Sequence, residues 1–537
     1  MKTNYKFNCG CTFEVDDGCI QFTPQWDSLN YECKATWDLI SSGNTKGLFQ
    51  IESSFGRQLC KRARVDSIDE LSNLIAAQRP GATQSFLEDG KSLSEHYFMR
   101  KNGEEEVVYL HPALEPYLKS TKGILIFQEQ QLDIAINIAG FTSIEADNLR
   151  KAIAKKLQDK LAQLKEPFIE GCKRLGKINE AEANTIFTWL QAAGRYSFNS
   201  SHSCSYAYIT YLTAYLKAHF PPQFFQSWLS HAGDKPNKQE EIQELTTNLK
   251  QMDLILNGPD FRLLNHHFCI KDKQLYFGLA DIKDVGKASL EKTMNATSTR
   301  ESSIGPRANW TENDLIFGFL PYILSTVANN LICSGAFDYI KSKPTYLKYQ
   351  YENIVGLYNT ASWPWIEGNY KNYKTPIEVV QNLLEIGGLK EVSKKKVRVA
   401  IQSLESPPYA LEDTAAYLAG EERRLLGVAI TCTEIDGCDV SSANCNIQDF
   451  INGKGGYILI GVNVDNIKEV TIKNGNSAGK RMAFISISDS SSSMQDVPVF
   501  TETWSKYKGY LTHGNTVMVA GKRGRDKGLL IEKVFQL

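Results

Sequence analysis

One stretch of the sequence combines residue types that suit the binding of an anion. Residues 194–225, GRYSFNSSHSCSYAYITYLTAYLKAHFPPQFF, place a polar loop before a segment rich in aromatic residues. The short side chains of this loop, among them Asn199 and His202, precede a helix whose first N–H groups lack backbone partners. The positive end of the helix dipole lies there as well, so the loop suits a phosphate. A simple helix cap is the alternative interpretation.

A helix over about residues 206–219 is predicted to position this loop. Tyr208, Leu212, Tyr215 and His219 recur at helical spacing, and Pro221-Pro222 ends the pattern. Two basic clusters lie upstream, and the bland interpretation of each is a solvated helix face. The clusters consist of Arg57, Lys61, Arg62 and Arg64, and of Arg150, Lys151, Lys155, Lys156 and Lys160.

The composition is that of a globular protein with several domains. The chain has 537 residues, an apolar fraction of 42% and a formal net charge of -1, so it can bury several cores. No apolar run is long enough to span a bilayer, and the N-terminal residues MKTNYKFNCGC lack the apolar core of a signal peptide. Twelve scattered cysteines favour free thiols in a reducing compartment. We therefore expect a cytoplasmic protein with no membrane partner.

The pattern of elements predicts a multidomain α+β protein in five parts. Residues 1–34 form a hairpin with a turn at Asp16-Asp17-Gly18, and residues 35–230 are mostly helical. Residues 231–346 mix helices with a short β segment, and residues 347–450 form an irregular connector with helices. Residues 451–537 contain about five or six short strands, which fit a small β-barrel.

Four cysteines near the N-terminus raise the question of a metal site. Cys9, Cys11, Cys19 and Cys33 lack the paired CxxC spacing of a zinc ribbon. Free thiols are the favoured interpretation, and zinc binding stays open.

Further motifs run along the chain in a fixed order. They are GLFQIES (47–53), RPG (79–81), HPALEP (111–116), GILIFQEQ (123–130), DNLRKAIAKK (147–156), YFGLADIKDV (276–285), LICSGAFD (331–338) and EERRLLGVAIT (421–431). In this order, and with the loop at 194–203, the chain resembles the C-family bacterial replicative polymerases, the DNA polymerase III α subunits. The resemblance covers nearly the whole chain.

The resemblance implies a function for each part. Residues 35–230 would be polymerase fingers, and residues 231–346 a clamp-region domain with a helix-hairpin-helix motif. Val285, Gly286 and Lys287 would offer backbone N–H groups to a DNA phosphate in that motif, and Lys155 and Lys156 would also contact DNA. Residues 451–537 would be an oligonucleotide-binding fold, with Tyr457, Phe484 and Phe500 as candidates for stacking or for the core.

Five residues match positions that the family uses for the incoming nucleotide. Arg150 and Lys151 would face its triphosphate, Asn199 and His202 would close on it, and Arg79 would shape the pocket. Lys151 stands where the family has arginine, which keeps the charge but loses the planar fork of donors. Ser200 stands where the family has lysine, which removes a positive charge.

The chain lacks a recognisable cluster of catalytic carboxylates. The resemblance implies that polymerisation requires Mg²⁺ held by palm carboxylates. The palm and the amino-terminal phosphoesterase-like domain of the family have no counterpart in this sequence. We therefore expect no catalytic residue and no metal ligand here, and the chain resembles the carboxy-terminal half of the polymerase.

These expectations describe the fingers and DNA-binding half of a split DNA-directed DNA polymerase, a nucleotidyltransferase of DNA replication that is inactive alone. Its partners would be primer-template DNA, deoxynucleoside triphosphates and a separately encoded palm polypeptide. A sliding clamp is a further candidate, although residues 381–386, QNLLEI, lack the usual terminal aromatic residue. The alternative is a non-catalytic protein that binds DNA or the replisome by mimicking the polymerase.

Overall fold

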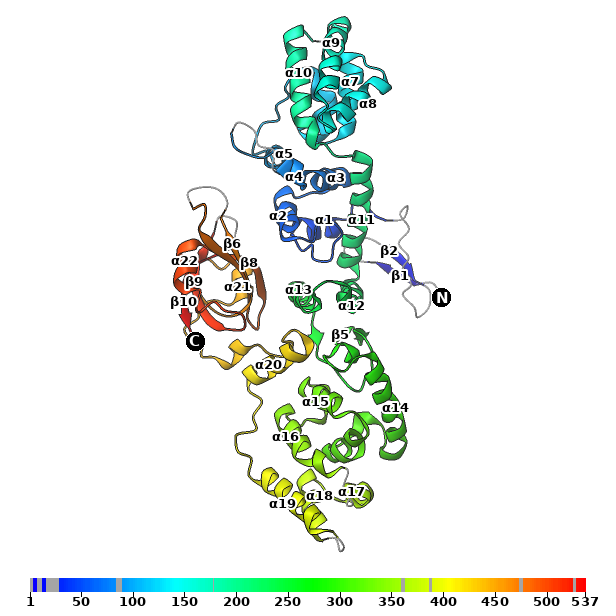
Figure 1. Ribbon diagram of the computed structural model, residues 1–537, viewed down its shortest axis with the longest axis vertical. Helices are drawn as coiled ribbons and strands as arrows, with labels where there is room; N and C mark the ends of the chain where they lie inside the picture. Colours follow the sequence, from blue (N-terminus) through cyan, green and yellow to red (C-terminus); the bar gives the residue numbers. More distant parts are fainter. Residues whose placement is uncertain are drawn as a thin grey trace. The chain divides into compact units, whose positions relative to one another are not determined.

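The computed structural model describes residues 3–6, 12–15, 29–83, 89–176, 178–358, 363–385, 389–472, 477–524 and 528–537 (Figure 1). The chain divides into two compact units, Met1–Pro221 and Pro222–Leu537. This boundary falls within the segment 35–230 that the sequence predicts as one domain, and the five-part division stays a prediction. In the described ranges, every helix is too short or too polar to cross a membrane.

The first unit begins with a two-stranded hairpin. Strands β1 (Thr3–Lys6) and β2 (Thr12–Val15) pair in antiparallel fashion, so residues 7–11 connect them. The predicted turn at Asp16-Asp17-Gly18 follows β2 instead of joining the strands, and it lies outside the described residues. Cys9, Cys11 and Cys19 lie outside them too. Cys33 is a buried free thiol whose Sγ lies 3.3 Å from Nε2 of His219.

The rest of the first unit is helical, as its sequence pattern predicts. Several helices begin at a polar cap followed three residues later by Glu, as at Ser92/Glu95, Thr142/Glu145 and Asn179/Glu182. The helices are α1 (Lys34–Ser41), α2 (Ser54–Ala63), α3 (Ile68–Ala77), α4 (Pro80–Thr83), α5 (Leu93–Lys101), α6 (Glu115–Leu118), α7 (Gln128–Ala139), α8 (Ser143–Ala154), α9 (Gln158–Leu175), α10 (Glu180–Ala193) and α11 (Ser200–His219).

Helices α7 to α10 share one core. Phe168 of α9 and Phe187 of α10 are fully buried in it, with ring centroids 5.3 Å apart. Gly171 of α9 lets the backbone of α7 approach closely, because a Cβ atom at this position would lie 1.7 Å from the carbonyl oxygen of Ala139. This bundle carries α8, the helix with the DNLRKAIAKK motif.

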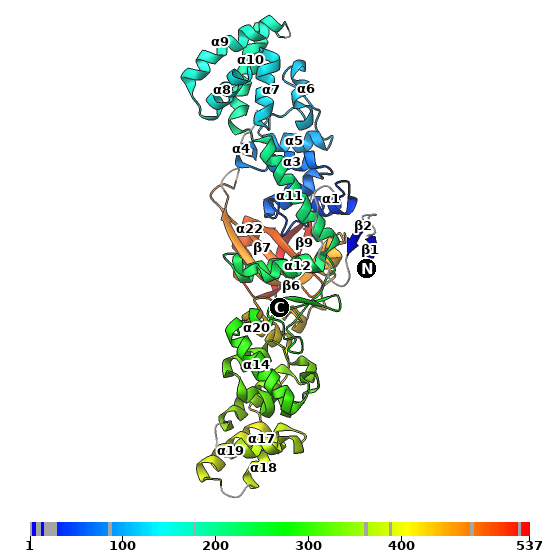
Figure 2. The same cartoon turned by 90° about the vertical axis from the view of Figure 1, so that its right-hand side faces the viewer.

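Helix α11 runs beside α1 and α3 (Figures 1 and 2). It begins at Ser200 rather than at about 206, because Asn199 caps it. Near its other end, the buried ammonium of Lys217 donates hydrogen bonds to the carbonyl oxygens of Asn44 and Lys46, at 2.9 and 2.8 Å. Burial is the main cause that lowers the pKa of Lys217 well below its ordinary value, with Lys46 and Arg57 adding repulsion. Both ends of α11 are therefore fixed to other segments of the unit.

The second unit contains a helical part and two sheets. A small sheet has the order β3-β5-β4, with strands Leu256–Asn257, Gln274–Tyr276 and Cys269–Lys271. The helices are α12 (Pro221–Ser230, which begins at the last residue of the first unit), α13 (Lys238–Lys250), α14 (Lys287–Ile304), α15 (Ser325–Cys333), α16 (Pro344–Ile354), α17 (Trp363–Asn369), α18 (Pro376–Asn382), α19 (Glu391–Glu405), α20 (Ala415–Leu426), α21 (Ile447–Ile451) and α22 (Thr501–Tyr507).

The candidate clamp peptide at 381–386 lies in folded structure. Nε2 of Gln381 donates a hydrogen bond to Oε1 of Glu405 in α19 at 2.8 Å, and Leu383 is fully buried. Ile386 lies outside the described residues. Residues 381 and 382 end α18, and residues 383–385 form a 3₁₀ turn. The side chains of Gln381 and Leu383 are therefore already engaged within the fold.

The C-terminal part forms a five-stranded antiparallel sheet with the order β10-β9-β6-β7-β8. Its strands are β6 (Tyr457–Thr471), β7 (Arg481–Ser488), β8 (Ser493–Val499), β9 (Thr516–Arg523) and β10 (Leu529–Gln536). Strand β6 is long and joins the apolar run YILIGVNV (457–464) to the residues up to Thr471. Its first half pairs with β9 and its second half with β7, on either side of an irregularity at Val464/Asn466.

This sheet is not closed by hydrogen bonds into the predicted barrel. Strands β8 and β10 are its two edges among the described residues. One side of the sheet nevertheless covers a single apolar core, to which Ile460, Ile485 and Trp504 contribute. The α+β class with a C-terminal antiparallel sheet is therefore confirmed, while closure is not.

Candidate nucleotide-binding site

The polar loop at 194–199 is held against the start of α7. The backbone N–H of Phe198 donates to the carbonyl oxygen of Ile126, and the N–H of Gln128 donates to that of Phe198, both at 2.8 Å. The side chain of Gln131 donates to Gly194 and to Ser197. These bonds fix the position of the loop relative to the first turn of α7.

Asn199 links this loop to α11 and to α7. Its Oδ1 accepts a hydrogen bond from the N–H of His202 at 2.8 Å, which caps α11. Its Nδ2 donates to Oε1 of Glu129 at 3.0 Å, and the N–H of Ser200 donates to Oε2 of Glu129 at 2.9 Å. A carboxylate of α7 thus lies at the end of α11 where the sequence predicts a phosphate.

Arg79 and His202 flank the ring of Phe198. The guanidinium carbon of Arg79 lies 3.8 Å from the ring centroid, a cation–π contact. The His202 ring lies edge-on to Phe198 at 5.4 Å and 3.9 Å from the ring of Tyr206. Both Arg79 and His202 are exposed, so the two side chains line an open surface and not a sealed interior.

Arg150 and Lys151 on α8 share one carboxylate. Nε and Nη2 of Arg150 donate to Oδ1 of Asp147 at 3.0 and 2.8 Å, and Nζ of Lys151 lies 2.6 Å from Oδ2. Nη1 of Arg150 donates to Oε1 of Gln128 at 3.0 Å, which connects α8 to the loop. Hydrogen bonds from Lys151 and then Arg150 lower the pKa of Asp147. The carboxylate is therefore ionised at neutral pH.

The contacts connect all five residues predicted for nucleotide binding. Arg79 and His202 meet at Phe198, Asn199 follows in the loop, and Arg150 and Lys151 are joined to it through Gln128 and Asp147. Their roles with a nucleotide stay predictions. The residues that the sequence reasoning missed are Gln128, Glu129 and Asp147, although all three lie in the QEQ and DNLRK motifs.

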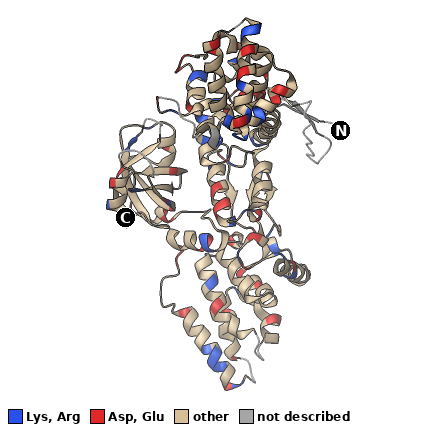
Figure 3. Ribbon diagram, turned by 45° about the horizontal axis from the view of Figure 1, so that its top comes forward, with Lys and Arg blue, Asp and Glu red and all other residues tan. Residues whose placement is uncertain are grey.

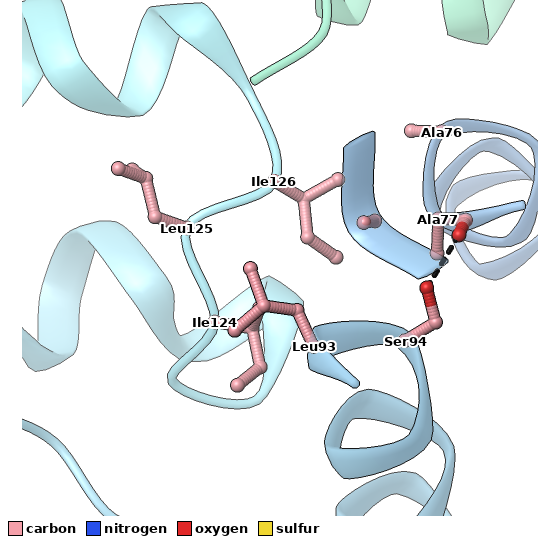
Figure 4. Close-up of a pocket in the computed structure, with 8 residues that line it drawn as sticks. Ala76, Ala77, Leu93, Ser94, Ile124, Leu125 and Ile126 are labelled. Carbon is pink, nitrogen blue, oxygen red and sulfur yellow. Dashed lines mark hydrogen bonds between the residues drawn. The ribbon is translucent and has the colours of Figure 1, made fainter. Parts of the chain in front are cut away.

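A small apolar cavity lies behind this site (Figure 4). It has a volume of about 10 Å³ and is lined by Ala76, Ala77, Ala82, Leu93, Ser94, Ile124, Leu125 and Ile126. The hydroxyl of Ser94 donates to the carbonyl oxygen of Ala77 at 2.6 Å. This space holds about one water molecule. The cavity is therefore too small for a nucleotide. It lies against residues 124–126, of which Ile126 accepts a hydrogen bond from the loop.

The residues predicted to bind DNA differ in their surroundings. Lys155 and Lys156 follow α8 and are exposed. Val285 is fully buried, and its N–H already donates to the carbonyl oxygen of Ile282 at 3.1 Å. That N–H is therefore used inside the fold, and its contact with a DNA phosphate stays a prediction.

Gly286 and Lys287 remain suited to such a contact. Gly286 has a φ of 57° and precedes α14, whose first turn has no side-chain cap. Lys287 is exposed. The segment before this turn contains only a short 3₁₀ helix, Leu279–Asp281, in place of the first α-helix of a helix-hairpin-helix motif. That motif stays a prediction.

Acidic residues are mixed with basic ones along the helices of both units (Figure 3). Over the described ranges, no group of three or more His, Cys, Asp or Glu side chains has the geometry to hold a metal ion.

Comparison with known proteins finds similar sequences along most of this chain. Residues 19–176 match the family described as the bacterial DNA polymerase III alpha subunit finger domain. The DNA polymerase III subunit alpha of Halalkalibacterium halodurans is 28% identical over 512 residues, which cover 94% of this chain and 41% of that protein. The chain is therefore similar to DNA polymerase III α subunits over nearly its whole length.

Two further family members give the same result. The subunit alpha of Staphylococcus epidermidis is 26% identical over 519 residues, 95% of this chain and 43% of the relative. That of Aquifex aeolicus is 35% identical over 310 residues, 57% of this chain and 25% of the relative. The chain therefore spans well under half the length of these DNA polymerase III α relatives.

Proposed function

We propose that this chain is the fingers and DNA-binding part of a DNA-directed DNA polymerase that acts in replication with a separately encoded palm polypeptide. The observation that carries the proposal is the joining of Arg79, Asn199, His202, Arg150 and Lys151 around one loop, since these residues match the family's nucleotide-contacting motifs. The similarity to DNA polymerase III α subunits over 94% of the chain supports it.

The side chains have distinct roles in this proposal. Arg150 and Lys151 attract the triphosphate, Asn199 and His202 contact it from the loop, and Arg79 supports the loop through Phe198. Arg150 offers planar paired donors, while Lys151 offers a point charge. The exposed Arg79 and His202 leave room for a ligand on the same surface.

The bond-forming step requires groups from the partner. The primer 3′-hydroxyl attacks the α-phosphorus of the nucleotide, and pyrophosphate leaves. Palm carboxylates would hold Mg²⁺, which would supply activation of the hydroxyl and neutralisation of the charge on the phosphates. The part of this chain that the structure describes has no matching cluster of carboxylates, so the proposal assigns those ligands to the partner.

The DNA is bound by other parts of the chain. Lys155, Lys156, Gly286 and Lys287 contact phosphates of the duplex without reading its sequence. We assign the C-terminal sheet to the oligonucleotide-binding fold, which binds single-stranded template. Tyr457 and Phe500 are 47% and 52% exposed, and the ammonium of Lys522 lies 5.8 Å from the Tyr457 ring centroid. An exposed ring beside a cation suits base stacking.

Primer extension tests the proposal directly. We expect no synthesis by the purified chain alone and synthesis when the palm polypeptide is added. Arg150→Ala should then lower kcat/KM for the nucleotide at least about tenfold, while Lys160→Ala, an exposed cation of α9, should leave it unchanged. Synthesis by the chain alone would contradict the split arrangement.

Recovery of the tagged chain from its native cell separates this proposal from the alternative. A co-purifying polypeptide with paired carboxylates on a strand supports the split polymerase. Recovery of DNA or replisome proteins with no such polypeptide supports a non-catalytic mimic instead.

A further inference from the structure

The groups that would attract a triphosphate are already neutralised by carboxylates of the same unit. Asp147 accepts hydrogen bonds from both Arg150 and Lys151. Glu129 accepts hydrogen bonds from the N–H of Ser200 and from Asn199, at the positive end of α11. A phosphate that approached these groups would meet two negative charges as well as the positive ones.

The Asp147 contact occupies the donors of Arg150 that face it. Two nitrogens of the guanidinium donate to one carboxylate oxygen, and a third donates to Gln128. Nζ of Lys151 contacts the other carboxylate oxygen, Oδ2 of Asp147. The side chain of Asp147 is 36% exposed and that of Lys151 is 55% exposed, so either can rotate into water without opening a core.

The Glu129 contact occupies the start of α11 in the same way. The carboxylate receives one backbone and one side-chain N–H, which is the arrangement that a phosphate oxygen pair would use. Glu129 is partly exposed and lies in the first turn of α7, next to Gln128, which contacts Arg150. The two carboxylates therefore act on one continuous surface.

We propose that in the free protein Glu129 and Asp147 accept the hydrogen bonds that the nucleotide phosphates would otherwise accept. A triphosphate then binds by displacing these two carboxylates from their donors. This inference rests on the proposed nucleotide site. On binding, Arg150 and Lys151 transfer their hydrogen bonds from Asp147 to phosphate oxygens, and Ser200 and Asn199 transfer theirs from Glu129. The two carboxylates thus compete with phosphates for these donors and lower the affinity of the site for anions.

Equilibrium binding of a deoxynucleoside triphosphate in the presence of EDTA tests the exchange. We expect Asp147→Asn and Glu129→Gln each to tighten binding by about fivefold or more, because each removes a competing charge and keeps an acceptor of similar shape. Asp159→Asn is the matched control. Asp159 is exposed at the start of α9, so its loss changes the net charge equally and should shift affinity less than about twofold.

The outcomes separate this inference from the proposed function. If wild-type binding of the triphosphate depends on Arg150 but both carboxylate variants bind it with unchanged or lower affinity, this inference alone is overturned. Asp147 and Glu129 are then positioning groups. Absence of binding by the wild type and by every variant overturns the nucleotide site as well. A single cooperative urea unfolding transition shows that each variant is folded. Tighter binding confined to Asp147→Asn and Glu129→Gln supports the exchange.

Discussion

Asp147 makes the stability of α8 depend on pH in a predictable direction. Hydrogen bonds from Lys151 and Arg150 hold its pKa below the ordinary value of 3.8 in the folded chain. As the pH falls, Asp147 is therefore protonated at a higher pH in the unfolded chain than in the folded chain. Its contribution to the free energy of unfolding is complete above about pH 5 and is lost below its lowered pKa.

We therefore expect Asp147→Asn to lower the urea midpoint at pH 6. The difference from the wild type should shrink as the pH falls below 3.8. Paired urea titrations across this range measure the effect. A difference that stays constant down to pH 2 would show that ionisation of Asp147 does not stabilise the fold.

Asn199 is predicted to stabilise α11 through its cap. Asn199→Ala removes the hydrogen bond to the N–H of His202 and should cost about 1 kcal/mol. Asn199→Ser keeps a side-chain acceptor and should recover most of that loss. Urea unfolding measures both, and equal losses in the two variants would mean that the cap is not the cause.

At the scale of elements, the crossing of α7 and α9 depends on Gly171. A methyl group there would lie 1.7 Å from the carbonyl oxygen of Ala139, and backbone cannot move aside as a side chain can. Gly171→Ala should therefore destabilise the first unit by about 3 kcal/mol. Gly420→Ala is the control, because Gly420 in α20 has open space at its Cβ position and alanine should add about 0.5–1 kcal/mol there. Calorimetry should show a lower unfolding temperature than that of the wild type for Gly171→Ala and a higher one for Gly420→Ala.

Local patterns predicted most of these elements, because helix periodicity and alternating strands depend on neighbouring residues. The start of α11 was placed too late, since the cap at Asn199 is a single polar residue and not a periodic signal. The length of β6 depends on its pairing with β9 and β7, whose residues are distant in the sequence. Periodicity within a strand contains no information on such partners.

The candidate site was predictable only in part for the same reason. Motif matches identified Arg150, Asn199 and His202, whose residue types suit phosphate. Glu129 was missed because a glutamate in the first turn of a helix is usual there, and only the docking of the loop onto α7 brings it to Ser200. The sequence did not indicate that the side chain of Val285 packs into a core, because that packing depends on residues distant in the sequence.

At the scale of the whole molecule, the chain is predicted to unfold in two steps. Each compact unit has its own buried clusters, which is the condition for independent cooperative transitions. Gly171→Ala should lower only one transition temperature and Gly420→Ala should raise only the other. A single transition that shifts in both variants would show that the units unfold together.

Helix α11 connects two functional motifs within the first unit. Its 20 residues span about 30 Å, with Asn199 and Glu129 at one end and Lys217 on residues 44–46 at the other. Residues 44–46 lead directly into the GLFQIES segment. Because the rod cannot shorten, a tilt imposed at its first turn must reappear as a displacement at its last. A displacement of the loop is therefore expected to move residues 44–46 as well.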